Sequence, residues 1–295
     1  MLKTVLGLGF LLLAPVSYAD NSRDLFVELY GERGSALPLE YQELEGLRGQ
    51  ELLEALHKKS GRGYRQYEYK EAKSMLYDSL YNFQGKVKTI YSGLSFAKSG
   101  GRYAEHGDQD HDGYEDDFVN CEHIWPQSKF NKDLPMVSDL HHLYPSLSVP
   151  NRMRSSYPFG EVGSSYSYST ISGSRLGGDE FEPADEDKGN VARAMLYFFT
   201  RYYNRNIWQK TQRHDFWDSR VSMFLEWNRL DPVDGAESAR NDRIAKKQGN
   251  RNPFVDYPEF ADRIGESVFT HSGRFSSDMT DASPSIVSEE DLGDD

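Results

Sequence analysis

Cysteine is almost absent from this sequence. Cys121 is the only cysteine among 295 residues, so no disulfide can form within the chain. A lone thiol can also act as a nucleophile, but it then needs an electropositive setting. Cys121 stands between Asn120 and the acidic Glu122, so a buried packing residue is the preferred interpretation.

Long apolar runs are also scarce. The run from Val5 to Ala14 is too short to span a bilayer. Lys3 precedes it and Ser17–Ala19 follows with small residues at the −3 and −1 positions of a cleavage site, which is typical of a secretory signal peptide. An uncleaved anchor is the alternative. From this pattern we expect cleavage after Ala19 and a periplasmic or secreted protein. No later stretch is apolar enough to cross a membrane, so we expect no membrane span.

Positive charge is in short supply. Lys and Arg number 34 against 47 Asp and Glu, and the net charge of −13 argues at first against a nucleic-acid partner. Residues 274–295 contain seven acids and one arginine, however, which gives this tail −6 and leaves −7 for the rest. The tail is rich in serine and poor in large apolar residues, so we expect it to be disordered. An enzyme that must release its product needs only a local basic groove lined by Lys and Arg.

The pattern of apolar residues predicts one α+β domain, mostly helical, with a small central β element. The expected division is a signal peptide at 1–19, an N-terminal arm at 20–45, the main domain at 46–270 and the acidic tail at 271–295. Helical periodicity is present in Glu51–His57, Tyr67–Phe83, Asp187–Tyr203, Phe216–Arg229 and Ala236–Gln248. Strands are predicted at Lys86–Leu94, Phe118–Trp125 and Leu143–Pro145, a loop or hairpin at 164–178, and a helix that starts at Ser148–Pro150 with Ser148 as its cap.

The residues best suited to chemistry lie in the segment Asn120–Pro126. Successive side chains of an extended strand point to opposite faces, so Glu122 and His123 are not expected to bind one metal together. They can still serve one reaction from two sides. In that interpretation Glu122 holds a metal and His123 activates the attacking water.

A second group of candidates follows in Asp139–Pro145 and Pro150–Ser155. If a helix starts near residue 149, Asn151 and Arg154 lie on one face of it. An amide oxygen is a suitable hard ligand for Mg²⁺, and an arginine can bind phosphate through two hydrogen bonds. With Glu122 and His123, these residue types supply the base, the Lewis acid and the cation that phosphodiester hydrolysis needs.

These motifs resemble the secreted and periplasmic endonuclease I family over about Leu52–Ile264. The resemblance implies a ββα-metal (His-Me) finger and largely sequence-non-specific cleavage of DNA that leaves 5′-phosphate ends, with RNA also cleaved by some relatives. The matching blocks occur in family order and are Glu122–Ser128, Asp139–Pro145, Asn151–Ser155, Lys188–Ala194 and Gln248–Phe254.

The family resemblance also implies roles for single residues. His123 matches the general base, Glu122 and Asn151 match the ligands of Mg²⁺ (with Mn²⁺ or Ca²⁺ as substitutes), and Arg154 matches a phosphate-contacting arginine. For His141 and His142 two interpretations stay open: a partner that orients a metal ligand or metal-bound water, or a hydrogen-bonded structural histidine. Asn250 and Asn252 are interpreted as turn and cap residues. We expect a monomer that acts on nucleic acid, and the disulfides of several relatives are missing here.

The acidic stretch before Val119 repeats the first half of an EF-hand loop. Its spacing is Asp-x-Asp-x-Asp-Gly, but Val119 occupies the twelfth position, where a complete EF-hand needs a bidentate Glu. A structural Ca²⁺ site and a solvated acidic loop are both open interpretations. If the calcium loop is the functional site, the alternative function is a secreted calcium-binding interaction protein without catalysis. The candidate calcium ligands are Asp108, Asp110, Asp112 and Asp116.

Overall fold

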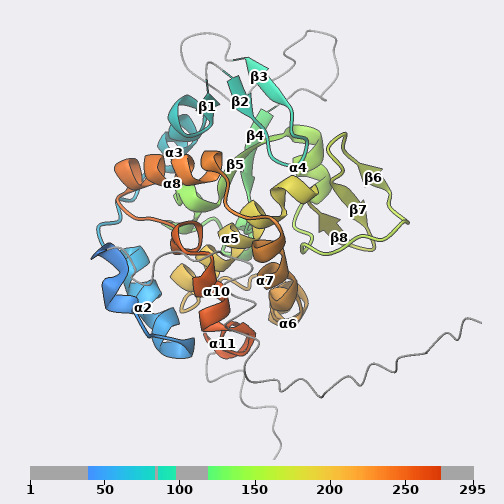
Figure 1. The fold of residues 1–295 in the computed structure, drawn as a ribbon. Helices are drawn as coiled ribbons and strands as arrows, with labels where there is room; N and C mark the ends of the chain where they lie inside the picture. The colour runs from blue at the N-terminus through green and yellow to red at the C-terminus, as the bar shows by residue number, and fades with distance from the viewer. Residues whose placement is uncertain (1–38, 84–85, 98–118, 274–295) are drawn as a thin grey trace, which may run out of the picture. The chain divides into compact units, whose positions relative to one another are not determined.

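The computed structural model describes residues 39–83, 86–97 and 119–273 (Figure 1). The chain divides into two units, 1–45 and 46–295. The described part of the first unit contains the 3₁₀ helix η1 (Leu39–Leu44). All further elements belong to the second unit. No helix in the described ranges combines the length and the apolarity that crossing a bilayer requires.

Helices are the main elements in the described part of the second unit. The α-helices are α2 (Gly49–Gly61), α3 (Tyr69–Met75), α4 (Ser148–Arg154), α5 (Asp185–Tyr202), α6 (Arg213–Phe216), α7 (Val221–Leu230), α8 (Gly235–Gln248), α9 (Pro253–Asp256), α10 (Glu259–Ile264) and α11 (Glu266–His271). A π-helical turn η2 (Leu76–Leu80) continues α3, and short 3₁₀ turns are η3 (Gln127–Lys129), η4 (Met136–Ser138), η5 (Leu140–His142) and η6 (Asp218–Arg220).

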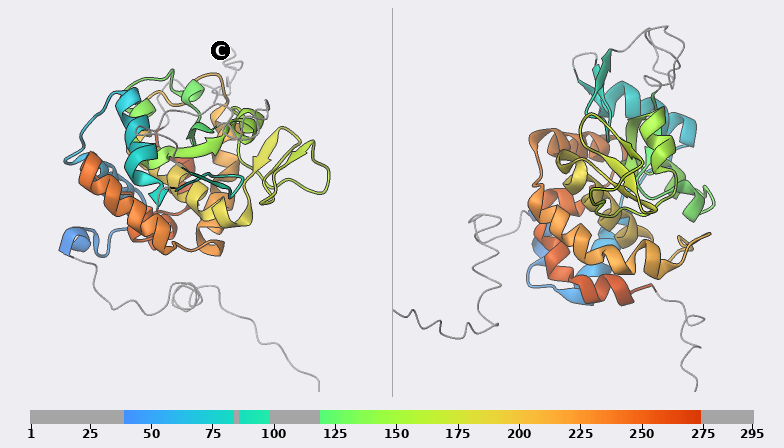
Figure 2. Two further views of the ribbon diagram at one scale, coloured as in Figure 1. Left: turned by 90° about the horizontal axis from the view of Figure 1, so that it is seen from above. Right: turned by 90° about the vertical axis from the view of Figure 1, so that its right-hand side faces the viewer.

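The strands form small antiparallel sheets. They are β1 (Asn82–Phe83), β2 (Lys86–Lys88) and β3 (Ser95–Ala97); β4 (Val119–His123) and β5 (Leu143–Leu147); and β6 (Tyr168–Ser169), β7 (Arg175–Gly177) and β8 (Glu180–Glu182). Figures 1 and 2 show the β6–β7–β8 sheet at an edge of this unit. The predicted α+β class, mostly helical with a small β element, is confirmed.

Helix α5 is the centre of the helical part. Its apolar residues recur at helical spacing, and every residue from Val191 to Tyr202 is buried. Acidic side chains in its first turn, Asp185–Asp187, suit the positive end of the helix dipole. The helix packs against α2, α7, α9 and η5 (Figure 1). It therefore supports η5, which leads into β5.

An aromatic cluster fixes the chain just after β4. The indole of Trp125 is fully buried and stacks on Phe198 of α5, with ring centroids 4.9 Å apart. Phe216 and Trp217 pack against the same indole at 5.1 and 5.5 Å. Stacked and edge-on aromatic pairs each add to the stability gained from burial. The end of β4 is thus attached to the central helix.

Four expected elements differ from the structure. The strand predicted over Lys86–Leu94 ends at Lys88, because the chain turns at Tyr91, where φ is 73°. The helix predicted over Tyr67–Phe83 ends at Leu80, because Asn82 and Phe83 pair with β2 instead. Ser148 is the first residue of α4 and not its cap, since β5 runs directly into the helix and Leu147 takes the cap position in extended conformation. The helix predicted over Phe216–Arg229 is broken at Trp217, which has φ −130° and ψ −62°, so α7 begins at Val221.

Candidate active site

The strands β4 and β5 and the helix α4 bring the two predicted motif regions together. The strands pair in antiparallel register, with Glu122 opposite Tyr144 and His123 opposite Leu143. Because α4 follows β5 without a loop, Asn151 returns to β4, where its Nδ2 donates to Asn120 Oδ1 at 2.6 Å. The chain order here is strand, strand, helix. The ββα-metal finger that the family resemblance implies stays a prediction. Figure 1 shows α4 beside β4 and β5.

Asn151 and Glu122 offer oxygen atoms on the same face of β4. Alternate residues of a strand share a face, so Asn120 and Glu122 do, and the amide bonded to Asn120 lies on that face as well. Nδ2 of Asn151 also lies 3.4 Å from the carbonyl oxygen of Cys121. Both neighbours are acceptors, which fixes the orientation of the amide. Its Oδ1 makes no hydrogen bond with the described residues and remains available as a ligand.

The carboxylate of Glu122 is buried and only partly satisfied. Its residue is 2 % exposed. The hydroxyl of Tyr91 donates to Oε1 at 2.8 Å, and Nη1 of Arg154 lies 3.4 Å from the same oxygen. Burial raises the pKa of Glu122 above its ordinary value, and Arg154, the Tyr91 hydroxyl and the amide of His123 counteract this only in part. A bound cation would stabilise this carboxylate in its charged form.

His123 is held as a neutral imidazole with a defined tautomer. It is 3 % exposed, and its ring lies against those of Tyr69, His142 and Phe130, at 5.4, 5.4 and 6.4 Å. Nε2 lies 3.0 Å from the carbonyl oxygen of Val137. A carbonyl only accepts, so Nε2 carries the proton and Nδ1 carries the lone pair. Burial, with His142 nearby, lowers the pKa of His123 to about 3. Nδ1 makes no hydrogen bond with the described residues.

Arg154 is surrounded by protein. The residue is 0 % exposed, and its guanidinium lies over the ring of Phe159 at 4.4 Å. Nη2 donates to the carbonyl oxygen of Ile124 at 2.6 Å and Nη1 to that of His123 at 3.3 Å. The arginine thus holds the end of β4 and faces the carboxylate of Glu122. Its contact with phosphate, which the resemblance implies, stays a prediction.

His141 and His142 are fully buried and hydrogen-bonded to backbone. Nε2 of His141 lies 3.1 Å from Asn250 O, and Nε2 of His142 lies 2.7 Å from Met136 O. Burial lowers the pKa of the two rings to about 3 and about 4. Within the described ranges no hydrogen bond links either ring to a predicted metal ligand. These contacts favour the structural interpretation, while a role in orienting a metal ligand stays a prediction.

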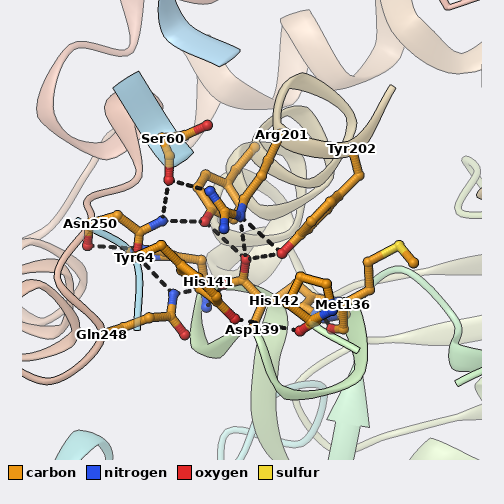
Figure 3. A network of polar contacts seen from close by, with 12 residues as sticks. Ser60, Tyr64, Met136, Asp139, His141, His142, Arg201, Tyr202, Gln248 and Asn250 are labelled. Atoms are coloured by element: carbon orange, nitrogen blue, oxygen red, sulfur yellow. Dashed lines mark hydrogen bonds and ion pairs between the residues drawn. The ribbon is translucent and has the colours of Figure 1, made fainter. Parts of the chain in front are cut away.

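A buried polar network fixes the turn that carries the two histidines (Figure 3). Its centre is Asp139, which precedes η5 and is 0 % exposed. The carboxylate receives five contacts, from Tyr202 Oη (2.7 Å), Gln248 Nε2 (2.9 Å), Tyr197 Oη (3.0 Å), Arg201 Nε (3.1 Å) and the amide of His141 (3.1 Å). Nη1 of Arg201 also donates to the carbonyl oxygen of Ser60 in α2, as does Nδ2 of Asn250. The η5 turn is therefore tied to α2, α5 and the end of α8.

The sequence can be compared with known proteins and protein families. A family model described as Endonuclease I matches residues 48–259. The chain belongs to the endonuclease I family. The family assignment that the motifs predicted is therefore confirmed.

Several curated relatives of this chain have descriptive names. An extracellular ribonuclease of Bacillus subtilis is 37 % identical over 155 residues, which are 49 % of this chain and 53 % of that protein. A periplasmic deoxyribonuclease of Aeromonas hydrophila is 32 % identical over 135 residues, 44 % of this chain and 50 % of that protein. An extracellular deoxyribonuclease of the same organism is 32 % identical over 127 residues, 41 % of this chain and 50 % of that protein. The chain spans about half the length of the curated relatives it matches.

Some predictions concern residues outside the described ranges. The candidate calcium ligands Asp108, Asp110, Asp112 and Asp116 lie there, as do the leader 1–19 and residues 274–295 of the tail. Within the described ranges, no three or more His, Cys, Asp or Glu side chains gather as a metal site. The assignment of Glu122 and Asn151 as metal ligands, with water as further ligands, stays a prediction.

Two residues near the site were not predicted from the sequence. Tyr91 stands 31 positions before Glu122, inside a stretch expected to be a plain strand. Val137 contributes only its carbonyl oxygen to His123, which any residue type could supply. Asn252 meets its prediction, because its side chain caps α9 by accepting from the amide of Phe254. Contacts through space and through backbone atoms leave little trace in a single sequence.

Proposed function

We propose that this member of the endonuclease I family is an exported, divalent-metal-dependent endonuclease. Its substrate is the phosphodiester backbone of DNA, cleaved largely without regard to sequence, and RNA is the second substrate class to test. The names of the relatives support both substrate classes, since they include a ribonuclease and deoxyribonucleases. Names that include extracellular and periplasmic support export, together with the leader that ends at Ala19.

The proposal depends above all on the tautomer of His123. Nε2 donates to Val137 O, so the lone pair is on Nδ1, and this nitrogen has no partner in the described ranges. A general base must be unprotonated and must reach a water molecule. His123, with its unprotonated Nδ1, follows Glu122 in the sequence. The carboxylate of Glu122 lies on the same face of β4 as the amide of Asn151.

Glu122 and Asn151 fit a hard divalent cation. Their donor atoms are a carboxylate and an amide oxygen, which Mg²⁺ prefers, and Mn²⁺ or Ca²⁺ accept the same donors. Asn151 is partly exposed, so a partly hydrated ion can approach from its side. When bound, the cation supplies positive charge to the scissile phosphate and to the leaving oxygen.

The residues of the chain then account for the proton transfer. Nδ1 of His123 takes a proton from a water molecule, and the water oxygen attacks phosphorus in line with the 3′ oxygen. The bond from phosphorus to the 3′ oxygen breaks, which leaves a 5′-phosphate end and a 3′ oxyanion that takes a proton from a solvent water molecule to become a 3′-hydroxyl. The imidazolium that forms still donates a hydrogen bond from Nε2 to Val137 O, which stabilises the positive charge of the ring. The polarity of the products is proposed from the family resemblance.

Cleavage of plasmid DNA and of a homopolymeric RNA in Mg²⁺ tests the proposal. We expect EDTA to abolish cleavage and His123→Ala to lower its rate by about 10²–10⁴-fold, the usual contribution of a general base. His214→Ala is the matched control, because His214 is exposed on α6 and outside the site. If the purified protein left both substrates intact in Mg²⁺, Mn²⁺ and Ca²⁺, the proposed function would be wrong.

A further inference from the structure

Tyr91 has an unusual backbone conformation for a buried aromatic residue. It is 0 % exposed and has a positive φ of 73°. Residues other than glycine disfavour the left-handed region of positive φ, because their Cβ then crowds the backbone. Such a conformation persists where the surrounding contacts require it.

Both polar backbone atoms of Tyr91 are held by other segments. Its carbonyl oxygen accepts from three hydroxyls of the segment that joins β6 to β7: Ser172 Oγ (2.6 Å), Thr170 Oγ1 (2.7 Å) and Ser174 Oγ (2.8 Å). Its amide donates to Oδ2 of Asp187, at the start of α5, at 2.9 Å. We call these three hydroxyls and the Asp187 carboxylate the Tyr91 clamp. The clamp explains why the positive φ is maintained.

The side chain held in this way reaches the site. Its ring lies edge-on to Phe181 with centroids 4.8 Å apart, and its hydroxyl donates to Oε1 of Glu122 at 2.8 Å. Arg154 approaches the same Oε1 at 3.4 Å. Neither contact involves Oε2 of Glu122. The two side-chain contacts thus both fall on Oε1, and neither of them occupies Oε2, which can act as a ligand.

We propose that Tyr91 is a positioning residue for the metal ligand Glu122, and that the Tyr91 clamp fixes the position of the Tyr91 hydroxyl. The inference rests on the proposed metal site. The hydroxyl restricts the rotation of the Glu122 carboxylate before a cation arrives, so less conformational freedom is lost on binding. Partners of this kind behind metal ligands typically contribute about 10–100-fold to metal affinity. A purely structural tyrosine would stabilise the fold without changing that affinity.

The test compares Tyr91→Phe with Tyr197→Phe. Tyr197 is also fully buried, and its hydroxyl also donates to a buried carboxylate, Asp139, at 3.0 Å. Mn²⁺ binding to the metal-free protein is measured by calorimetry without substrate, and the melting temperature is measured in EDTA. We expect Tyr91→Phe to weaken Mn²⁺ binding by about 10–100-fold, and Tyr197→Phe to lower the melting temperature while Mn²⁺ binds as in the wild type.

Two further measurements sharpen the test. Ser172→Ala removes one hydroxyl of the clamp at a partly exposed position and should weaken Mn²⁺ binding by a smaller factor, which keeps the inference testable if Tyr91→Phe does not fold. Cleavage by Tyr91→Phe should need more Mg²⁺ for half-maximal rate but approach the wild-type rate at saturation.

The outcomes separate the two proposals. Wild-type protein that binds Mn²⁺ and cleaves, beside a Tyr91→Phe variant that binds Mn²⁺ equally well, would overturn the positioning role alone. Wild-type protein that neither binds a divalent cation nor cleaves would overturn the metal site and the positioning role together. Loss of thermal stability with unchanged Mn²⁺ affinity in both Tyr91→Phe and Ser172→Ala would also reduce Tyr91 to a structural residue.

Discussion

The substitution Asp139→Asn tests how strongly the buried network holds the η5 turn. Asparagine has the shape of aspartate but no charge, so the change removes the ion pair with Arg201 and replaces one of the two acceptor oxygens by a donor. Burial alone would raise the pKa of Asp139, but Arg201, the two neighbouring histidines and the Tyr202 hydroxyl together hold it below its ordinary value. The carboxylate is therefore charged in the folded protein, and the guanidinium beside it always is.

The magnitude follows from how deeply the pair is buried. Asp139 is 0 % and Arg201 8 % exposed, and Arg201 is also confined by the ring of Tyr64, 4.0 Å from the guanidinium carbon. Removing one partner of a buried ion pair leaves the other charge uncompensated and typically costs about 3–5 kcal/mol. The new amide also places a donor where the carboxylate received donors on both oxygens. For a folded unit of this size the melting temperature should fall by about 6–20 °C.

Urea denaturation at pH 7, followed by circular dichroism, measures the free energy of unfolding. Asp262→Asn is the matched control, because its pair with Arg229 (2.6 Å) is partly exposed and such pairs contribute about 0–1 kcal/mol. An Asp139→Asn variant that unfolds within 1 kcal/mol of the wild type would refute the reasoning, since the network would then carry little of the stability of the turn.

Two further predictions concern stability. Burial lowers the pKa of His141 to about 3 and that of His142 to about 4, so at pH values between 6.5 and 4 the unfolded chain binds protons that the folded chain does not. The contribution of the two neutral rings to the free energy of unfolding is complete above pH 6.5. Below pH 6.5 it falls by up to about 1.4 kcal/mol per pH unit for each ring. Urea denaturation from pH 7 to 4.5 should show this slope, which His142→Gln should reduce and His214→Gln should leave unchanged. Gly189→Ala should destabilise by about 1–3 kcal/mol despite the better helix propensity of alanine, because a Cβ would lie 2.1 Å from the carbonyl oxygen of Asp231, whereas the control Gly235→Ala meets nothing within 4 Å. Equal melting temperatures of these two glycine variants would contradict the close approach.

The helices and strands around the site could be predicted where the pattern lies within one segment of the sequence. The apolar periodicity after Asp187 predicts α5, and the motif around Glu122 predicts β4. Arg154 shows where this fails. A guanidinium suits a phosphate and backbone carbonyls equally, so residue type alone did not reveal its contacts with His123 O and Ile124 O. The Asp139 network joins residues as far apart as 190 positions, and no local pattern records such pairs.

Asp139 and Glu122 show how contacts separate a structural carboxylate from a candidate ligand. Both are buried and both accept a tyrosine hydroxyl. Asp139 receives donors on both oxygens and its pKa is lowered, so its charge is already compensated by the fold. The Tyr91 and Arg154 contacts of Glu122 are confined to Oε1, and its pKa is raised. A buried carboxylate whose charge the fold compensates incompletely is stabilised most by a bound cation. The incomplete compensation at Glu122 is therefore an argument for a cation at this site.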